Sequence, residues 1–255
     1  MKARLDGVKI LVTRPSGQSA ELVRLISAAG GEPVLFPALE IEALAAAAPA
    51  LDHLAHFDLV VFVSPNAVRT GMPHILKKGG LPAEAKIAAM GPGTAAELKK
   101  FRVGDIILPR NGFDSEALID ELSILPLRSQ HALIVRGQGG RELLGETLAL
   151  QGARVDYLEC YRRVKPDRDM RELMSRQVGE GKNACMATSA NIVENLFEMA
   201  GAAGRAWLCA MPFFVSHPRV ASAAFCRGVQ AVFVAGSGDD ALMAGMLTWF
   251  ARVTP

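Results

Sequence analysis

An internal duplication limits the folds open to this 255-residue sequence more than any other feature. The aliphatic run Ile10–Arg14 has a counterpart that ends at Arg136, 122 positions after Arg14. Two further pairs of similar segments are 63–68 with 188–193, at an offset of 125, and 91–95 with 217–221, at an offset of 126. A near-constant offset across separate blocks is much rarer than a chance match between short aliphatic runs. It therefore predicts two similar lobes.

Short aliphatic runs alternate with helix-length segments along the chain. Most runs are apolar throughout and are followed by Gly, Ser or Pro, which is typical of parallel strands buried on both faces. Ten strands are predicted, and they begin near Val8, Glu32, Leu59, Lys86, Asp105, Ala132, Arg154, Ala184, Pro212 and Gln230. The predicted fold class is therefore α/β, with two similar lobes, each a parallel sheet of about five strands flanked by helices.

Two segments are candidates for linkers between the lobes. Pro37–Pro49 is rich in alanine, and Tyr161–Asp169 is polar and charged. Both follow a βαβ unit, so the chain can be written A–B–A′–B′, where A is that unit and B holds three strands. The sequence leaves open whether A packs with B and A′ with B′, or whether A packs with B′ and B with A′.

The composition excludes several classes of protein. Lys and Arg total 28 against 26 Asp and Glu, a formal net charge of +2, so the basic excess typical of nucleic-acid binding is missing. No apolar run approaches the roughly 18 residues of a membrane span, and Met1–Gly7 lacks the apolar region of a signal peptide. The four cysteines form no CxxC pair and no zinc-ligand spacing. We therefore expect a cytoplasmic protein with free thiols and no bound metal.

Polar residues that follow the strands are the candidate binding residues. The turns at Ser64, Thr94, Gly137 and Ser189 fall at the carboxyl ends of predicted parallel strands, where such sheets bind ligands. Helix N-termini at these turns offer N–H groups and a favourable dipole to carboxylates. An ordinary helix cap is the alternative for each Ser or Thr, and one residue can do both.

Three arginines are candidates for binding carboxylates. Arg14 and Arg136 are related by the duplication and lie just past strand ends. A guanidinium group in that place can bind a carboxylate through two parallel hydrogen bonds. Arg141 can reach the same place from its helix, and a solvated surface position is the alternative for all three.

Five motifs make the sequence similar to the uroporphyrinogen-III synthases along nearly its whole length. They are Leu11–Pro15, Phe62–Val68, Met90–Ala95, Arg136–Arg141 and Tyr157–Tyr161. Each is weak alone, and their order and spacing together carry the resemblance. It implies that A packs with B′, with residues 1–36 and 170–255 in one lobe and 45–160 in the other. A two-stranded linker at 37–44 and 161–169 would join the lobes, with the active cleft between them.

The resemblance also implies a reaction. Hydroxymethylbilane, a linear tetrapyrrole with many carboxylates, loses its terminal hydroxyl and closes to uroporphyrinogen III, an intermediate of heme biosynthesis. The last pyrrole ring is inverted on the way, through a spiro intermediate. The bilane also closes unaided without that inversion, so the enzyme must hold one folded conformer. No metal or cofactor is implied.

Tyr161 is the residue that the resemblance marks for proton chemistry. It is one of two tyrosines and begins the second linker, at the mouth of the expected cleft. It matches the tyrosine that the family favours as donor to the departing hydroxyl, and an interface residue that wedges the linker is the alternative. Val220 stands where many family members have Thr. His217 and Arg219 are expected to offer positive charge to a substrate carboxylate there instead.

Other functions fit the same features. The main alternative is a two-lobed, non-catalytic protein that binds a small anionic ligand. Further alternatives are a Rossmann-like transferase with a nucleotide or methyl-donor cofactor, and a regulatory module derived from the synthase fold. As partners we expect hydroxymethylbilane and a transient contact with the preceding pathway enzyme. We expect a monomer that binds neither nucleic acid nor membrane.

Overall fold

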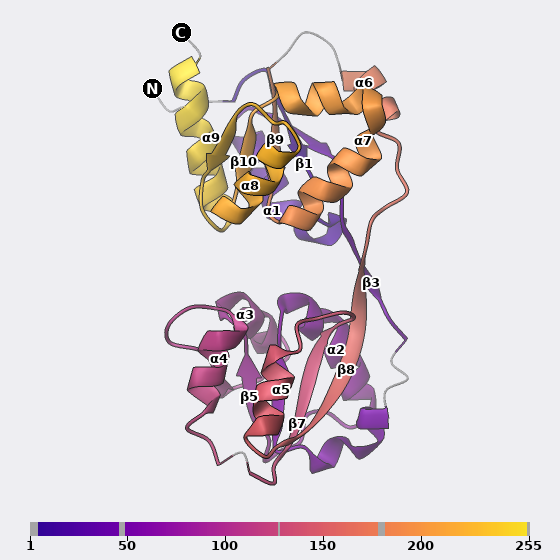
Figure 1. Ribbon diagram of the computed structural model, residues 1–255, viewed down its shortest axis with the longest axis vertical. Helices are drawn as coiled ribbons and strands as arrows, with labels where there is room; N and C mark the ends of the chain where they lie inside the picture. The colour runs from indigo at the N-terminus through magenta and orange to yellow at the C-terminus, as the bar shows by residue number, and fades with distance from the viewer. Residues whose placement is uncertain (1–4, 46–48, 127, 178–181, 254–255) are drawn as a thin grey trace. The chain divides into compact units, whose positions relative to one another are not determined.

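The computed structural model divides the chain into two compact units (Figure 1). It describes residues 5–45, 49–126, 128–177 and 182–253. Unit 1 comprises Met1–Glu40 together with Val164–Pro255, and unit 2 comprises Ile41–Arg163. The two ends of the chain therefore belong to one unit, and the middle of the chain forms the other.

Unit 1 is built around a five-stranded parallel sheet with the order β11-β10-β9-β1-β2. Its strands are β1 (Val8–Val12), β2 (Glu32–Leu35), β9 (Lys182–Ala187), β10 (Phe213–Val215) and β11 (Val232–Val234). Its helices are the short 3-10 turn η1 (Ser16–Gln18), α1 (Ala20–Ala28), α6 (Met170–Gln177), α7 (Ala190–Ala210), α8 (Pro218–Cys226) and α9 (Asp239–Val253). Figure 1 shows the indigo β1 beside the orange β9, so strands from opposite ends of the chain pair in one sheet.

Two apolar cores cover the two faces of this sheet. Successive side chains of a strand point to opposite faces. Leu11 of β1 accordingly packs on one side with α7 and α8, while Ile10 and Val12 pack on the other side with α1 and α9. Burial on both faces is the reason that β1 carries apolar residues at Ile10, Leu11 and Val12 in succession instead of alternating.

Unit 2 has a six-stranded sheet with the order β3-β8-β7-β4-β5-β6. Its strands are β3 (Glu40–Ala43), β4 (Leu59–Phe62), β5 (Lys86–Ala89), β6 (Ile106–Ile107), β7 (His131–Gly137) and β8 (Arg154–Val164). Its helices are the 3-10 segment η2 (Pro49–His56), α2 (Pro65–Lys77), α3 (Pro92–Lys99), α4 (Ser115–Leu122) and α5 (Leu143–Leu150). Val60 and Phe62 pack with α2 and α3 on one face, and Leu59 and Val61 with α4 and α5 on the other.

The duplication extends to the register of the strands. Val12 of β1 pairs with Met186 of β9. Shifting these residues by the sequence offsets of 122 and 125 leads to Ile134 and Val61, which are paired in the same way in unit 2. The pairs Phe213–Cys185 and Ile87–Val60 correspond in the same manner. The predicted α/β fold with two similar parallel sheets is confirmed, and the strand orders combine A with B′ and B with A′.

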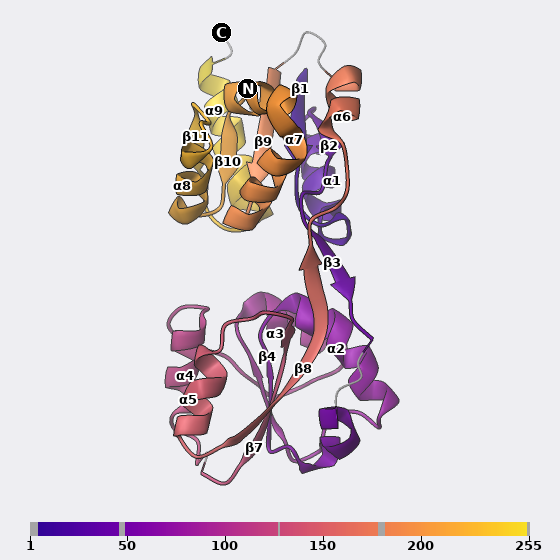
Figure 2. The same ribbon diagram turned by 45° about the vertical axis from the view of Figure 1, so that its right-hand side comes forward.

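The strand β3 was not among the ten predicted strands. Its residues Glu40, Ile41 and Glu42 lack the continuous apolar character of the others, and they lie at the edge of the sheet beside β8. Figure 2 shows β3 and β8 side by side and running in opposite directions. The segment from Tyr161 to Val164, which was expected to begin a linker, continues β8 in extended form.

Three general expectations concern membrane-spanning helices, metal-binding groups and the cysteines. Within the described ranges, none of the helices combines the length and apolar character that a bilayer crossing requires. The described residues also hold no group of three or more His, Cys, Asp or Glu side chains arranged to bind a metal. All four cysteines are free thiols, and burial raises the pKa of Cys185 well above its usual value.

Candidate active site

Four of the predicted site residues lie at one edge of the sheet of unit 2. Ser64 follows β4, Thr94 is in the first turn of the helix after β5, Gly137 ends β7, and Tyr161 lies near the end of β8. Parallel strands have their carboxyl ends at the same edge, which brings these residues into one neighbourhood. The first turns of α2 and α3 are adjacent, since a Cβ added to Gly93 would lie 3.7 Å from Cγ of Pro65.

Tyr161 is buried, with 1 % of its surface exposed, and its phenol group has two polar neighbours. Its Oη lies 3.0 Å from Oγ of Ser64. Nη2 of Arg163 donates to the same Oη at 3.4 Å. Tyr161 was expected at the mouth of a cleft. The structure instead places its ring against the core of unit 2, because β8 continues through this residue.

A local irregularity in β8 aims the ring of Tyr161 at Gly137. Arg136 pairs with Glu159, but the next residue, Gly137, pairs with Tyr161, so Cys160 is an extra residue in β8. Such a bulge redirects the side chains that follow it. A Cβ added to Gly137 would lie 2.6 Å from Cζ of Tyr161, so only glycine leaves room for the ring. Gly137 was also expected to begin a helix, but α5 begins only at Leu143.

Ser64 links the start of α2 to the phenol. Its backbone is extended, and its Oγ accepts a hydrogen bond of 3.1 Å from the N–H of Ala67, the geometry of an N-cap. Ser64 therefore both caps the helix and contacts Tyr161. Pro65 occupies the first helical position, where its missing N–H costs nothing.

Thr94 lies in the first turn of α3 and is buried, with 3 % of its surface exposed. Gly91 is the N-cap of this helix and accepts a hydrogen bond of 3.1 Å from the N–H of Thr94. Phe113 packs directly on Gly91, since a Cβ added to Gly91 would lie 3.2 Å from Cβ of Phe113. Backbone N–H groups at this helix start can bind an anion. The Thr94 side chain is buried, so it faces neighbouring residues of unit 2 and not solvent.

Arg136 is enclosed by two carboxylates and an aromatic ring. Its Nη2 donates to Glu142 at 2.8 Å and to Glu159 at 3.1 Å. Its guanidinium carbon lies 4.1 Å from the ring centroid of Tyr157, a cation–π contact. Nη1 of Arg136 is buried and has no partner among the described residues. The hydrogen bond from Arg136 lowers the pKa of Glu142, while burial, followed by the charge of Glu142, raises the pKa of Tyr157.

Arg141 is separate from this group of residues. It is exposed and forms an ion pair with Glu116 of α4, with 2.9 Å between Nη2 and Oε1. Exposed pairs of this kind contribute little to stability because water and salt screen them. The guanidinium group therefore stays available to an incoming anion.

The predicted residues of unit 1 also lie at a carboxyl edge. Ser189 is the N-cap of α7 and accepts a hydrogen bond of 3.2 Å from the N–H of Ile192. His217 is the N-cap of α8, and its Nδ1 accepts a hydrogen bond of 3.2 Å from the N–H of Arg219. Oγ of Ser216 donates to the carbonyl of Thr188 at 3.1 Å, which ties the two turns together.

Two further positions of unit 1 follow from the duplication. Arg14 is paired with Asp239 at the start of α9, so both duplicated arginines have a carboxylate partner within their own unit. Val220 is 4 % exposed and occupies the place that Thr94 has in unit 2. Its hydroxyl-free side chain packs in the core, and the exposed polar groups at this turn are His217 and Arg219.

Several polar partners of the site residues were not predicted from the sequence. Arg163 carried a usable signal, because residues two apart in a strand share a face and it follows Tyr161 at that spacing. Glu159 could have been paired with Arg136 only from the register of β7 and β8. Glu142 and Asp239 carry no local signal that distinguishes them from other surface carboxylates.

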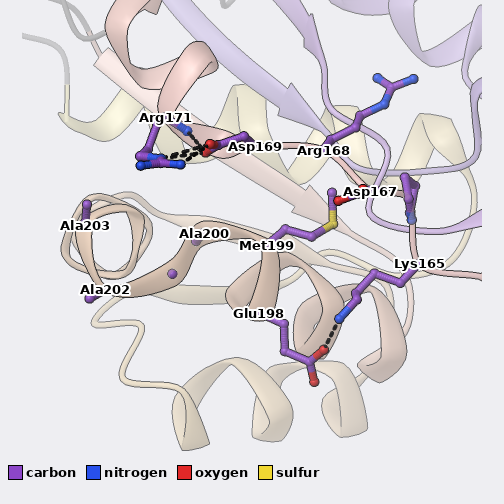
Figure 3. A pocket seen from close by; sticks show the side chains of 12 residues that line it. Lys165, Asp167, Arg168, Asp169, Arg171, Glu198, Met199, Ala200, Ala202 and Ala203 are labelled. Carbon is purple, nitrogen blue, oxygen red and sulfur yellow. Dashed lines mark hydrogen bonds and ion pairs between the residues drawn. The ribbon is translucent and has the colours of Figure 1, made fainter.

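A groove of about 620 Å³ in unit 1 contains none of the predicted site residues. Figure 3 shows it between residues 165–171 and the part of α7 around residues 198–203. Ion pairs of Lys165 with Glu198, at 2.6 Å, and of Arg171 with Asp169, at 2.6 Å, lie along its walls. The helix start at this groove is that of α6, where Oδ1 of Asp169 accepts from the N–H of Arg171 at 2.8 Å. None of the helix starts at the two carboxyl edges lines the groove.

Comparison with known proteins identifies relatives along almost the whole chain. The family model described as uroporphyrinogen-III synthase HemD matches residues 20–244. The uroporphyrinogen-III synthase of Salmonella typhimurium is 34 % identical over 242 residues, which are 92 % of this chain and 98 % of the relative. That of Escherichia coli is 31 % identical over 242 residues, with the same coverage.

Solved structures resemble the fold. A mutant uroporphyrinogen III synthase from Thermus thermophilus has a TM-score of 0.62 at 22 % identity, covering 96 % of this chain and 99 % of that one. The uroporphyrinogen-III synthetase of Helicobacter pylori has a TM-score of 0.60 at 12 % identity, covering 94 % and 99 %. With the family match across both units, the chain belongs to the uroporphyrinogen-III synthase family.

Proposed function

We propose that this protein is a uroporphyrinogen-III synthase, a cyclising lyase of heme biosynthesis. It closes hydroxymethylbilane with loss of water and inversion of the terminal pyrrole ring. The observation that carries the proposal is the family match over residues 20–244, with curated relatives of that name covered almost completely. The arrangement of the polar residues at the two carboxyl edges supports it.

Substrate binding rests on helix starts at both carboxyl edges. The bilane carries many carboxylates, and N–H groups at helix N-termini bind carboxylates with help from the helix dipole. In unit 2 these starts are at Ser64 and near Thr94, and in unit 1 they are at Ser189 and His217. Holding several carboxylates at once selects one folded conformer of a flexible chain, which is the catalytic requirement of this reaction.

The arginines divide into two groups in this proposal. Arg141 and Arg219 are exposed and meet a substrate carboxylate directly. Arg14 and Arg136 are held by carboxylates of their own unit. They bind a substrate carboxylate only if it replaces Asp239 or Glu142.

Gly137 serves the site by leaving room for the ring of Tyr161.

Tyr161 is the proposed proton donor. Its phenol hydrogen moves to the terminal hydroxyl of the bilane, the carbon–oxygen bond breaks, and water leaves. The electron-rich pyrrole supplies most of the driving force for this expulsion. The terminal ring then bonds at its substituted carbon, forms the spiro intermediate, opens and recloses in inverted order. The proton lost from the pyrrole carbon at ring closure restores the phenol, so the net change is the loss of one water.

An isomer assay tests the proposal. Purified protein is mixed with hydroxymethylbilane, and the products are oxidised and separated by chromatography. We expect the type III isomer, whereas the bilane alone and the heat-inactivated protein give type I. A protein that binds the bilane but gives only type I would be the non-catalytic binder instead. Tyr161→Phe is expected to lower kcat by about tenfold to a hundredfold and to keep the type III product.

The finer expectations on partners and location stay predictions. We propose that the protein acts as a monomer in the cytoplasm and meets the enzyme that supplies the bilane only transiently. The spontaneous closure of the bilane supports such a contact, since direct transfer shortens its time in solution. Sedimentation of the two enzymes together, with and without bilane, measures both the oligomeric state and the contact.

A further inference from the structure

Arg163 contacts the phenol of Tyr161 in two ways. Its Nη2 donates to Oη at 3.4 Å, and its guanidinium carbon lies 5.6 Å from the centroid of the ring. Both residues belong to β8 and are two positions apart, so their side chains share one face of the strand. Arg162, between them, forms an ion pair with Glu42 of β3 instead, at 2.7 Å.

The hydrogen bonds around Ser64 and Tyr161 leave one hydroxyl hydrogen unused. Oγ of Ser64 accepts from the N–H of Ala67, and Oη of Tyr161 accepts from Arg163. A single contact of 3.0 Å joins the two oxygens and uses one of their two hydrogens. The bonds described for these two hydroxyl groups therefore account for one of their hydrogens, and the other can donate to a group outside this cluster.

A guanidinium group has no acceptor, so Arg163 can only donate to Oη. This donation is compatible with both directions of the contact between Oη and Oγ of Ser64, for which either oxygen can be the donor. The positive charge of Arg163 nevertheless favours the departure of the phenol hydrogen, because the negative charge that then forms on Oη lies beside the guanidinium group.

We propose that Arg163 is a positioning residue that holds the phenol of Tyr161 ready to donate its hydrogen to the departing hydroxyl of the bilane. This inference rests on the proposed function. In the step itself the phenol hydrogen goes to the hydroxyl oxygen, water leaves, and the phenolate lies beside the guanidinium group. The opposite charges attract, so Arg163 stabilises the state that the proton transfer creates.

A double-mutant cycle between Arg163 and Tyr161 tests the inference. The variants are Arg163→Met, Arg163→Lys, Tyr161→Phe and the Arg163→Met/Tyr161→Phe double variant. Arg162→Met is the matched control, since it removes a neighbouring arginine that does not contact Tyr161. For each variant, kcat, KM for hydroxymethylbilane and the ratio of type III to type I product are measured.

The expected result is a loss in kcat that depends on the phenol. Arg163→Met is expected to lower kcat by roughly threefold to tenfold with little change in KM, the effect of losing one hydrogen bond of ordinary strength. Arg163→Lys keeps part of the activity. With Phe at position 161, removing Arg163 costs less than about twofold, because no hydroxyl remains to be oriented. Arg162→Met behaves like the unchanged protein.

Two outcomes would overturn the inference. An equal loss from Arg163→Met with Tyr and with Phe at position 161 would mean that Arg163 acts without the phenol. A rise in KM at unchanged kcat would mean that it only binds substrate. Failure of the proposed function is visible separately, because the unchanged protein would then form no type III product.

A spectroscopic measurement keeps the inference testable in that case. Protein labelled with ¹³C at Cζ of tyrosine gives one signal for each of the two tyrosines, and Tyr161→Phe assigns them. Arg163→Met is expected to shift the Tyr161 signal clearly more than Arg162→Met does. Equal shifts would contradict the contact on which the inference rests.

Discussion

Gly137 shows how much a single residue contributes to the site. Tyr161 is buried against it, and Ser64 and Arg163 complete the surroundings of the phenol. None of these contacts follows from residue type alone. They depend on the bulge at Cys160, which brings Tyr161 opposite Gly137.

Gly137→Ala is expected to displace the phenol. The new Cβ would lie 2.6 Å from both Cε2 and Cζ of Tyr161, so the ring must move. Overpacking of this kind costs about 1–3 kcal/mol of the free energy of unfolding, which urea denaturation measures. We also expect kcat to fall toward that of Tyr161→Phe.

Gly104→Ala is the matched control for this change. An added Cβ at Gly104 has no neighbour within 4 Å, and that glycine does not have a positive φ. It should leave stability and kcat unchanged. If Gly137→Ala were equally silent, the close packing of Tyr161 on Gly137 would be wrong.

At the scale of elements, helix starts repeat in both units. The N-cap residues Ser64, Gly91, Ser189 and His217 all follow parallel strands, and three of them accept a hydrogen bond from the first turn through their side chain. A strand that ends in a polar cap is readable in the sequence, because capping depends on residues within one turn. The helix starts at Ser64, near Thr94 and at Ser189 were therefore predicted from local pattern, whereas the start expected at Gly137 was wrong because α5 begins only at Leu143.

Ser64→Ala and Ser189→Ala are expected to separate capping from the contact with Tyr161. Each loses an N-cap, which costs about 1 kcal/mol of the free energy of unfolding. Ser64→Ala should in addition lower kcat, because the phenol loses its hydroxyl partner. Urea denaturation and the isomer assay measure the two effects.

The corresponding threonine variants are the controls. Thr retains the hydroxyl group, so Ser64→Thr and Ser189→Thr should restore most of the lost stability. A Ser64→Ala variant with unchanged stability and unchanged kcat would remove both roles assigned to Ser64.

The pair of Arg136 and Glu142 predicts a pH dependence of stability. Hydrogen bonding to Arg136 holds the pKa of Glu142 below its ordinary value of 4.5. In acid the unfolded chain therefore takes up a proton at Glu142 before the folded chain does. The stabilisation is present above pH 4.5 and is lost as the pH falls through that value toward the lower folded pKa.

Glu142→Gln tests this dependence. The difference in unfolding free energy between the unchanged protein and this variant should be largest at pH 7 and shrink at pH 4, as measured by urea denaturation. Glu146→Gln, one turn further along α5, is the control for removing a carboxylate from this helix, and a trend shared by both variants would not be assigned to the pair of Arg136 and Glu142. A difference that grew in acid would contradict the assigned pair.

At the scale of the whole molecule, the two units differ in how the chain enters them. Unit 2 is continuous in sequence, while unit 1 combines the first part of the chain with the last. In unit 1 the strand β1 lies between β2 and β9, so the sheet cannot be completed by the C-terminal part alone. This difference has a direct consequence for fragments.

A fragment of residues 40–164 is expected to fold alone. It contains all six strands of its sheet and both of its cores. Circular dichroism and urea denaturation should show a cooperative transition. A fragment of residues 165–255 lacks β1 and β2 and should stay unfolded until residues 1–40 are added. Independent folding of the C-terminal fragment would contradict the pairing of β1 with β9.

The sequence alone determined ten of the strands, most of the helix starts and the duplication. These features depend on periodicity and capping, which act within a few residues. The sequence did not determine that A pairs with B′, because β1 and β9 are about 170 residues apart and both orders satisfy the same local pattern. The edge strand β3 was missed because its residues Glu40, Ile41 and Glu42 lack the continuous apolar character of the other strands.

Only the tertiary structure decided the partners of the charged and polar side chains. The duplication identified Arg14 and Arg136, but not that Asp239, Glu142 and Glu159 neutralise them. The family resemblance marked Tyr161 as a residue of interest, but not its burial against Gly137 or its contact with Arg163. Such contacts arise when distant segments pack, and their energies depend on distances that local sequence patterns do not carry.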